Sequence, residues 1–128
     1  MNPSTPQKNK LLIVEDDFYI RDTYTIQARL MNFDIMTAVD GEEALDKIKT
    51  KTIDIMLLDL MLPKIDGMSI LKMVKSDPLY SALKIIVISN MDDLSLKEEA
   101  KKLGALEYLL KIQYPPREVL EITQKYLQ

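Results

Sequence analysis

The sequence predicts an α/β protein built on a doubly wound, five-stranded parallel sheet with helices on both faces. Short apolar runs rich in β-branched residues alternate with longer segments whose apolar residues recur at helical spacing. The run at residues 55–58 does not alternate between apolar and polar residues, which is typical of a strand buried on both faces. Strands that alternate with helices are joined by crossovers and therefore pair in parallel.

The first predicted strand covers residues 10–14 and is followed by three acids, Glu15, Asp16 and Asp17. One explanation of such acids is a solvated helix start. That explanation suits Asp17 best, as the N-cap of a helix over residues 18–31.

A weaker second strand is predicted over residues 35–39. Asp40-Gly41 breaks it and opens a helix to about residue 50. The third strand, residues 55–58, leads into Asp59. Because a carboxylate is very costly deep in a sheet, we expect Asp59 at the exposed carboxyl tip of this strand.

A third helix is predicted over residues 68–75. The β-branched run at residues 85–88 then forms the fourth strand and ends at Ser89. A helix follows over residues 94–103, and Gly104 fits as its left-handed C-terminal cap.

The last strand is predicted over residues 106–110 and is followed at once by Lys111, while Pro116 is well placed to open a final helix. Right-handed crossovers between the strands give the flavodoxin-like order 2-1-3-4-5. We expect one domain over residues 10–128, preceded by a flexible polar tail at residues 1–9.

The composition excludes several kinds of chemistry. The 128 residues contain no cysteine and no histidine, so disulfides, thiol catalysis and zinc-thiolate sites are excluded. A net charge of −3 gives no indication of direct nucleic-acid binding. The sequence shows neither a signal peptide nor an apolar run long enough to span a membrane, so a cytoplasmic protein without membrane contact is expected.

Polar side chains follow the strands that should lie side by side in the sheet. Because the carboxyl ends of parallel strands meet at one edge, Glu15, Asp16, Asp59, Ser89 and Lys111 should converge there. Each residue alone has a plainer explanation, such as a solvated lysine or a strand-end hydroxyl that bonds to the backbone. Their joint placement at four strand ends favours a site.

Three carboxylates in one pocket need a neutralising cation, since two unit charges about 4 Å apart repel by roughly 4 kcal/mol at an effective dielectric near 20. Oxygen ligands without histidine or cysteine favour Mg²⁺, Mn²⁺ or Ca²⁺, and a few carboxylates at an open edge suit Mg²⁺. A cation, Lys111 and Ser89 around a carboxylate suit phosphoryl transfer, with Asp59 as the nucleophile.

These strand ends resemble the motifs of the receiver domains of two-component response regulators, over about residues 10–127. The matching segments are residues 12–17, residues 58–63 with Asp66-Gly67, residues 86–89 and residues 108–111.

The resemblance implies that Asp59 accepts a phosphoryl group from a phosphohistidine of a histidine kinase or histidine phosphotransfer protein. It also implies that Asp16 and Asp59 bind Mg²⁺ directly, that Glu15 acts through water, and that the backbone carbonyl of Met61 is a further ligand. Lys111 then pairs with the phosphoryl group. The protein is expected to catalyse its own phosphorylation from phosphodonors and its own dephosphorylation.

In this family Ser89 and an aromatic residue, here Tyr108, are the switch. Taken alone, Tyr108 is explained as well by half-buried packing. The resemblance implies that Ser89 moves toward the phosphoryl group while the ring of Tyr108 turns inward. The face made by the helix at residues 94–103, the last strand and the last helix then changes its affinity for a downstream protein target, which the sequence does not identify.

Three departures from the family pattern stand out. Ile112 follows Lys111 where proline is common, and we expect a trans bond between them. The loop that ends at Pro116 is one residue longer than usual. Asn90 stands where a small residue is frequent; together with Met61 and Met91, which flank the site, it is hypothesised to slow hydrolysis of the phosphoryl group.

Several alternatives stay open. The leading interpretation is a stand-alone receiver. A receiver excised from a hybrid kinase or a DNA-binding regulator is another, and a non-phosphorylated pseudo-receiver a third. A flavodoxin-type FMN protein shares the fold, but Glu15, Asp16 and Asp17 would repel a phosphate in its binding loop. The sequence leaves open a monomer or a phosphorylation-linked dimer.

Overall fold

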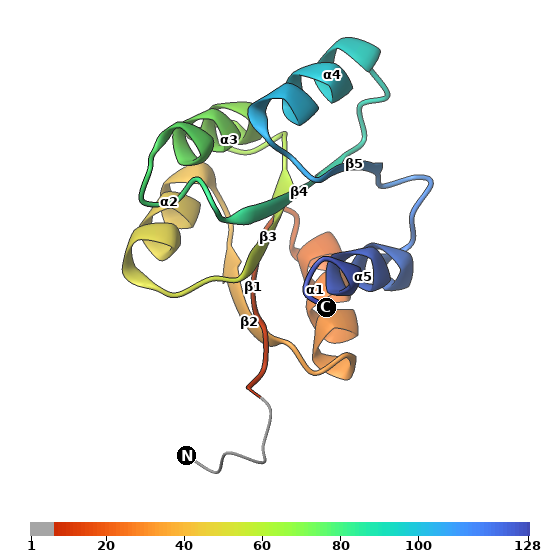
Figure 1. Cartoon of the computed structure of the whole chain (residues 1–128). Coiled ribbons are helices and arrows are strands. Elements are labelled where there is room, and N and C mark those ends of the chain that lie inside the picture. Colours follow the sequence, from red (N-terminus) through yellow and green to blue (C-terminus); the bar gives the residue numbers. More distant parts are fainter. Residues whose placement is uncertain (1–6) are drawn as a thin grey trace.

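The computed structural model describes residues 7–128, which form a parallel sheet in the order β2-β1-β3-β4-β5 with five helices around it (Figure 1). The predicted fold class and strand order are confirmed. The strands are β1 (Lys10–Val14), β2 (Asp34–Ala38), β3 (Ile55–Asp59), β4 (Lys84–Ser89) and β5 (Glu107–Leu110). The helices are α1 (Phe18–Leu30), α2 (Gly41–Thr50), α3 (Gly67–Ser76), α4 (Leu94–Leu103) and α5 (Pro116–Lys125).

The sheet separates two apolar cores. Helices α2, α3 and α4 cover one face, and α1 and α5 cover the other (Figure 1). Successive strand residues point to opposite faces, so Leu12 and Leu58 pack with the first group of helices while Leu11 and Leu57 pack with the second. Every residue of β3 is buried, which explains why its sequence does not alternate.

The helix ends follow the predicted chemistry. The side chain of Asp17 accepts a hydrogen bond from the amide of Ile20 and caps α1, and Gly104 ends α4 with a φ of 111°. Small differences occur at element ends: β2 starts at Asp34, one residue before its predicted start, and β5 starts at Glu107. The ends of helices and strands are less well defined than their centres, so the pattern of apolar residues predicts them only to within about one or two residues.

Two expectations concern the ends and the backbone. Most of the predicted tail, residues 1–6, lies outside the described residues. Over residues 7–128 there is no cis peptide bond, so the bond between Lys111 and Ile112 is trans as predicted. Within the same residues, none of the helices has both the length and the apolar character needed to cross a lipid bilayer.

Candidate functional site

Three charged side chains meet at the carboxyl edge of the sheet. Glu15 follows β1, Asp59 ends β3 and Lys111 follows β5. The Nζ atom of Lys111 lies 2.6 Å from Oε1 of Glu15 and 3.1 Å from Oδ2 of Asp59. Only 11% of the Lys111 side chain, 1% of Glu15 and 5% of Asp59 is exposed, so the cluster is a buried ion-pair network.

The sheet register produces this meeting. Asp59 pairs with Ile88 of β4, so the next residue, Ser89, extends one position beyond the end of β3. Ser89 in turn pairs with Leu110, and its carbonyl accepts a hydrogen bond of 2.9 Å from the amide of Lys111. The strand order therefore brings the ends of distant segments together.

The expectation that Asp59 is exposed is wrong. Asp59 is indeed the last residue of β3, but it is 3% exposed. Its Oδ1 accepts the amide hydrogen of Met61 at 3.1 Å, and its Oδ2 accepts from Lys111. Burial is tolerated because both oxygens of the carboxylate have donors.

Asp16 completes an acidic group. One carboxylate oxygen each of Glu15, Asp16 and Asp59 lie within 4.8 Å of one another, and Asp16 is exposed where the other two are buried. A set of carboxylate oxygens without nitrogen or sulfur ligands fits a hard divalent cation such as Mg²⁺. The exposed position of Asp16 leaves such a cation open to solvent and to a substrate.

Burial and a neighbouring acid raise the pKa values of Glu15 and Asp16. Burial, and then the hydrogen bond and charge of Asp59, raise the pKa of Glu15 against the opposing effect of Lys111. Partial burial, and then the adjacent Glu15, raise the pKa of Asp16. Burial acts to lower the pKa of Lys111, but its contacts with the two buried acids outweigh burial and raise it. One lysine therefore does not fully compensate the group, which leaves it attractive to a further cation.

Ser89 and Tyr108 both bond to the backbone of Met91. The fully buried hydroxyl of Ser89 accepts the Met91 amide hydrogen at 3.0 Å, and the Tyr108 hydroxyl donates to the Met91 carbonyl at 2.7 Å. Ser89 thus has the backbone bond of a strand-end hydroxyl. Tyr108 is buried, at 9% exposure, which is deeper than the half-buried packing that explains this residue when it is taken alone, and its hydroxyl bonds to the loop after β4.

The flanking residues lie at the surface. Met61 is 63% exposed and Met91 is 40% exposed. Asn90 lines a pocket of about 390 Å³ beside Lys111, together with Ile112 and residues of α1 and the loop before α5. Their effect on access to the acids stays a prediction.

Two residues near the acids are not among the predicted site residues. Arg21 donates a hydrogen bond of 2.8 Å to the carbonyl of Glu15 and one of 3.3 Å to the carbonyl of Asp16. Tyr24 is buried on α1, and burial together with the charges of Glu15 and Asp59 raises its pKa. The only sequence signal for Arg21 is its place one helical turn after the cap Asp17.

Comparison with known proteins gives a consistent result. The model of the family described as the response regulator receiver domain matches residues 11–124. The chain is 30% identical over 118 residues to the sporulation initiation phosphotransferase F of Bacillus subtilis, and the match covers 92% of this chain and 93% of that protein.

Other relatives are longer. The chain is 36% identical over 110 residues to the alkaline phosphatase synthesis transcriptional regulatory protein PhoP of Bacillus subtilis, covering 86% of this chain and 45% of that protein. It spans from 42% to 49% of the length of several curated relatives, all described as transcriptional regulators.

Solved structures share the fold over nearly the whole chain. A receiver domain protein described as CheY-like, from Methanospirillum hungatei, superposes with a TM-score of 0.87 at 26% identity, covering 94% of both chains. A response regulator from Chloroflexus aurantiacus, described as putative, superposes with a TM-score of 0.85 at 31% identity, covering 93% of this chain and 97% of the other.

Proposed function

The chain belongs to the response regulator receiver domains, and from this premise we propose that Asp59 accepts a phosphoryl group from a phosphohistidine of a sensor kinase or of a histidine phosphotransfer protein. Receiver domains act by phosphorylation and interact with kinases or phosphotransfer proteins. The observation that carries the proposal is the buried network of Lys111 with Glu15 and Asp59 beside an exposed third acid, Asp16.

Asp59 acts as the nucleophile. One carboxylate oxygen attacks the phosphorus of the donor, so that a P–O bond forms and the P–N bond of the phosphohistidine breaks. The released imidazole keeps the electron pair and takes a proton from solvent. Lys111 lies within 3.1 Å of Asp59 and is placed to stabilise the negative charge of the transferred group. In the later dephosphorylation, a water molecule attacks the phosphorus of the aspartyl phosphate: a new P–O bond forms, the P–O bond to Asp59 breaks, the carboxylate keeps the electron pair, and inorganic phosphate leaves after the water loses its proton to solvent.

Receiver domains bind Mg²⁺ in an acidic pocket, and the acids of this chain fit that ion. The carboxylates of Asp16 and Asp59 and the carbonyl of Met61 would hold it, with Glu15 acting through water. Once bound, the ion neutralises charge on the phosphoryl oxygens and on the acids. Mn²⁺ is expected to substitute for it.

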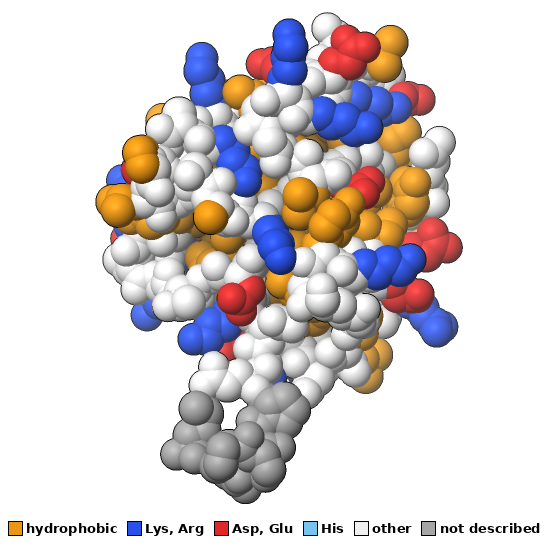
Figure 2. Space-filling model, in the orientation of Figure 1, with side chains coloured by type: hydrophobic (Ala, Val, Ile, Leu, Met, Phe, Trp, Pro, Cys, Tyr) orange, Lys and Arg blue, Asp and Glu red, His pale blue; other side chains and the backbone are white. Residues whose placement is uncertain are grey.

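Ser89 and Tyr108 couple phosphorylation of Asp59 to a change at the protein surface. Ser89 bonds to the amide of Met91 and Tyr108 bonds to its carbonyl, so a shift of the Ser89 hydroxyl toward a phosphoryl group on Asp59 would break one of these bonds and loosen the loop. Figure 2 shows hydrophobic side chains gathered between α4 and α5, over the region of β5, with charged side chains around them. We propose that this α4–β5–α5 face changes its affinity for a downstream protein.

Residues 10–128 are proposed to act as one receiver domain through protein contacts, without binding nucleic acid directly. A stand-alone receiver remains the leading proposal. Because several relatives are about twice as long, a receiver that works within a hybrid kinase or a DNA-binding regulator is the alternative.

The test is the intact mass of the protein after incubation with Mg²⁺ and acetyl phosphate. One added phosphoryl group is expected on the wild-type chain, and none on Asp59→Asn or in the presence of EDTA. Asp54→Asn is the matched control, because Asp54 lies just before the opposite end of the same strand and should not affect labelling.

Labelling of Asp59→Asn would show that another residue is the acceptor. Absence of any adduct on the wild-type chain, under conditions that label a known receiver, would indicate a non-phosphorylated pseudo-receiver.

A further inference from the structure

Arg21 forms hydrogen bonds with the loop that carries two of the three acids. It lies in α1, and one guanidinium nitrogen, Nη1, donates to the carbonyls of Glu15 and Asp16 at 2.8 and 3.3 Å. The guanidinium carbon lies 5.7 Å from the centre of the Phe18 ring, a cation–π distance. Both hydrogen bonds go to the backbone of the loop, not to its carboxylates.

These bonds fix the peptide planes from which the acids project. The loop between β1 and the cap of α1 consists of Glu15 and Asp16 alone, so a rotation of either peptide would redirect a carboxylate. At the other end of the loop, Oε2 of Glu15 accepts the amide hydrogen of Asp17 at 3.3 Å, and Asp17 itself caps the helix. Without Arg21 the carbonyls of the loop would lose their side-chain donor.

We propose that Arg21 is a positioning residue for divalent-cation binding, which it promotes by orienting the loop that presents Glu15 and Asp16. This inference rests on the proposed function, since it assumes that the acids bind the ion. Arginine suits the role because its planar guanidinium group holds its N–H donors in fixed directions. Here the group also lies over the Phe18 ring. Lysine carries a point charge on a flexible chain and lacks this fixed geometry.

The proposal predicts the direction in which the affinity for Mg²⁺ changes when Arg21 is replaced. Removing a positive charge beside three acids should by itself strengthen cation binding, because it removes repulsion. Loss of a residue that orients metal ligands instead weakens binding, typically by 10- to 100-fold. The direction of the change therefore separates positioning from simple electrostatics.

The experiment is a calorimetric titration of the unphosphorylated protein with Mg²⁺, at fixed ionic strength and pH. We expect the Kd for Mg²⁺ to rise about 10-fold in Arg21→Met. A smaller rise is expected in Arg21→Lys, which keeps the charge but not the fork. Arg29→Met is the matched control: it removes the same charge from the last turn of α1 and should leave the Kd unchanged or slightly lower.

Melting temperatures in EDTA establish that each variant is folded, and Arg21→Lys carries the test if Arg21→Met does not fold. Binding by either Arg21 variant that is as tight as in the wild type, or tighter, would overturn the positioning role alone. Failure of the wild-type chain to bind Mg²⁺ would overturn both this role and the proposed metal site. An equal loss in Arg29→Met would also contradict the proposal, because it would reflect a general effect of helix charge.

Discussion

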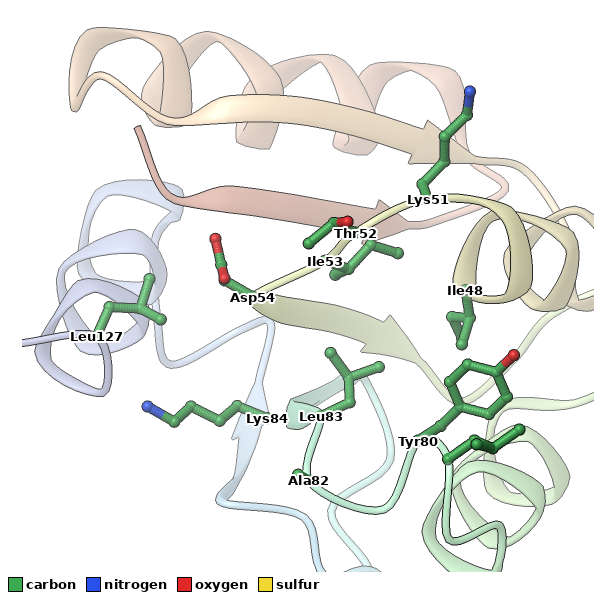
Figure 3. A pocket seen from close by; sticks show the side chains of 11 residues that line it. Ile48, Lys51, Thr52, Ile53, Asp54, Tyr80, Ala82, Leu83, Lys84 and Leu127 are labelled. Atoms are coloured by element: carbon green, nitrogen blue, oxygen red, sulfur yellow. The ribbon is translucent and has the colours of Figure 1, made fainter. Parts of the chain in front are cut away.

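At the carboxyl ends of β1, β3 and β5 the sheet edge holds buried charges that face one another, whereas at the amino ends of β3 and β4 it borders a pocket of about 450 Å³ lined largely by apolar side chains (Figure 3). The second hollow includes Ile53, Leu83 and Leu127. Two of its charged side chains form hydrogen bonds with the backbone: Lys84 donates to the carbonyl of Tyr126, and Asp54 accepts from the amide of Lys10.

The arrangement of charge at the carboxyl edge, and not the size of a hollow, favours this edge as the functional site that we propose. At the amino edge Asp54 and Lys84 each bond to a neutral backbone group and stay at the surface. At the carboxyl edge two acids share one lysine, and the pKa of Glu15 is raised because burial and Asp59 outweigh that lysine. A fold selected for stability alone has no need of such a cluster.

The largest expected difference between the two edges comes from one substitution made at each. Lys111→Met leaves Glu15 and Asp59 buried without a cation and should lower the free energy of unfolding in EDTA by about 3–5 kcal/mol. Lys84→Met removes an exposed lysine and should change it by about 0.5 kcal/mol at most. Urea denaturation of both variants measures the difference.

Repeating the measurement with Mg²⁺ in place of EDTA gives a second comparison. The ion should restore part of the free energy of unfolding lost in Lys111→Met and none of that lost in Lys84→Met. Equal losses in the two variants would mean that the buried network at the carboxyl edge is not special.

Gly67 gives the next largest effect. A Cβ atom at Gly67 would lie 2.6 Å from Cα of Leu60 and closer still to the carbonyl oxygen of Asp59, so Gly67→Ala must displace the end of β3. We expect a loss of about 1–3 kcal/mol in stability, together with slower labelling of Asp59 by acetyl phosphate.

Gly104→Ala is the control for Gly67→Ala. It should cost about 1–2 kcal/mol through its positive φ but leave labelling unchanged, because Gly104 meets only the methylene groups of Lys75. Normal labelling of a destabilised Gly67→Ala protein would show that Asp59 tolerates displacement of its strand end.

At the carboxyl edge, the sequence predicts which residues converge but not how deeply they are buried or which residues support them. The meeting of Glu15, Asp59 and Lys111 was predictable, because parallel strands place their carboxyl ends on one edge and the predicted strand order makes β1, β3, β4 and β5 consecutive. The burial of Asp59 was not predictable, because it depends on donors that tertiary structure brings to its carboxylate, the Met61 amide and the Lys111 ammonium. Arg21 was not predictable either, because a bond from a side chain to a backbone carbonyl depends on the path of the loop and not on residue spacing.

A smaller effect is expected from pH. The pKa of Glu15 is raised above its value of 4.5 in an unfolded chain, mainly by burial, so between that value and the folded pKa the native state binds more protons than the unfolded one. Stability in EDTA should therefore fall as pH rises through this range. Glu15→Gln should remove this part of the pH dependence, as measured by urea denaturation from pH 4 to 8.

An unchanged pH dependence in Glu15→Gln would assign the effect to other acids. Asp54→Asn serves as the control from the amino edge. Among residues 7–128 the group of three acids that approach one another is Glu15, Asp16 and Asp59, so a substitution at Asp54 should leave the pH profile as it is.

The smallest expected effect concerns the lifetime of the phosphoryl group. Asn90 follows the buried Ser89 and lines the pocket beside Lys111, where we propose that its side chain restricts the approach of water. Asn90→Gly should let water approach more easily and shorten the half-life of the aspartyl phosphate by a few-fold, as followed by intact mass after removal of acetyl phosphate. Met91→Ala, which opens the same rim without changing the pocket beside Lys111, should have a weaker effect. A half-life unchanged in both variants would mean that access at this rim does not limit hydrolysis, and the rate would then be set by the groups that contact Asp59 itself.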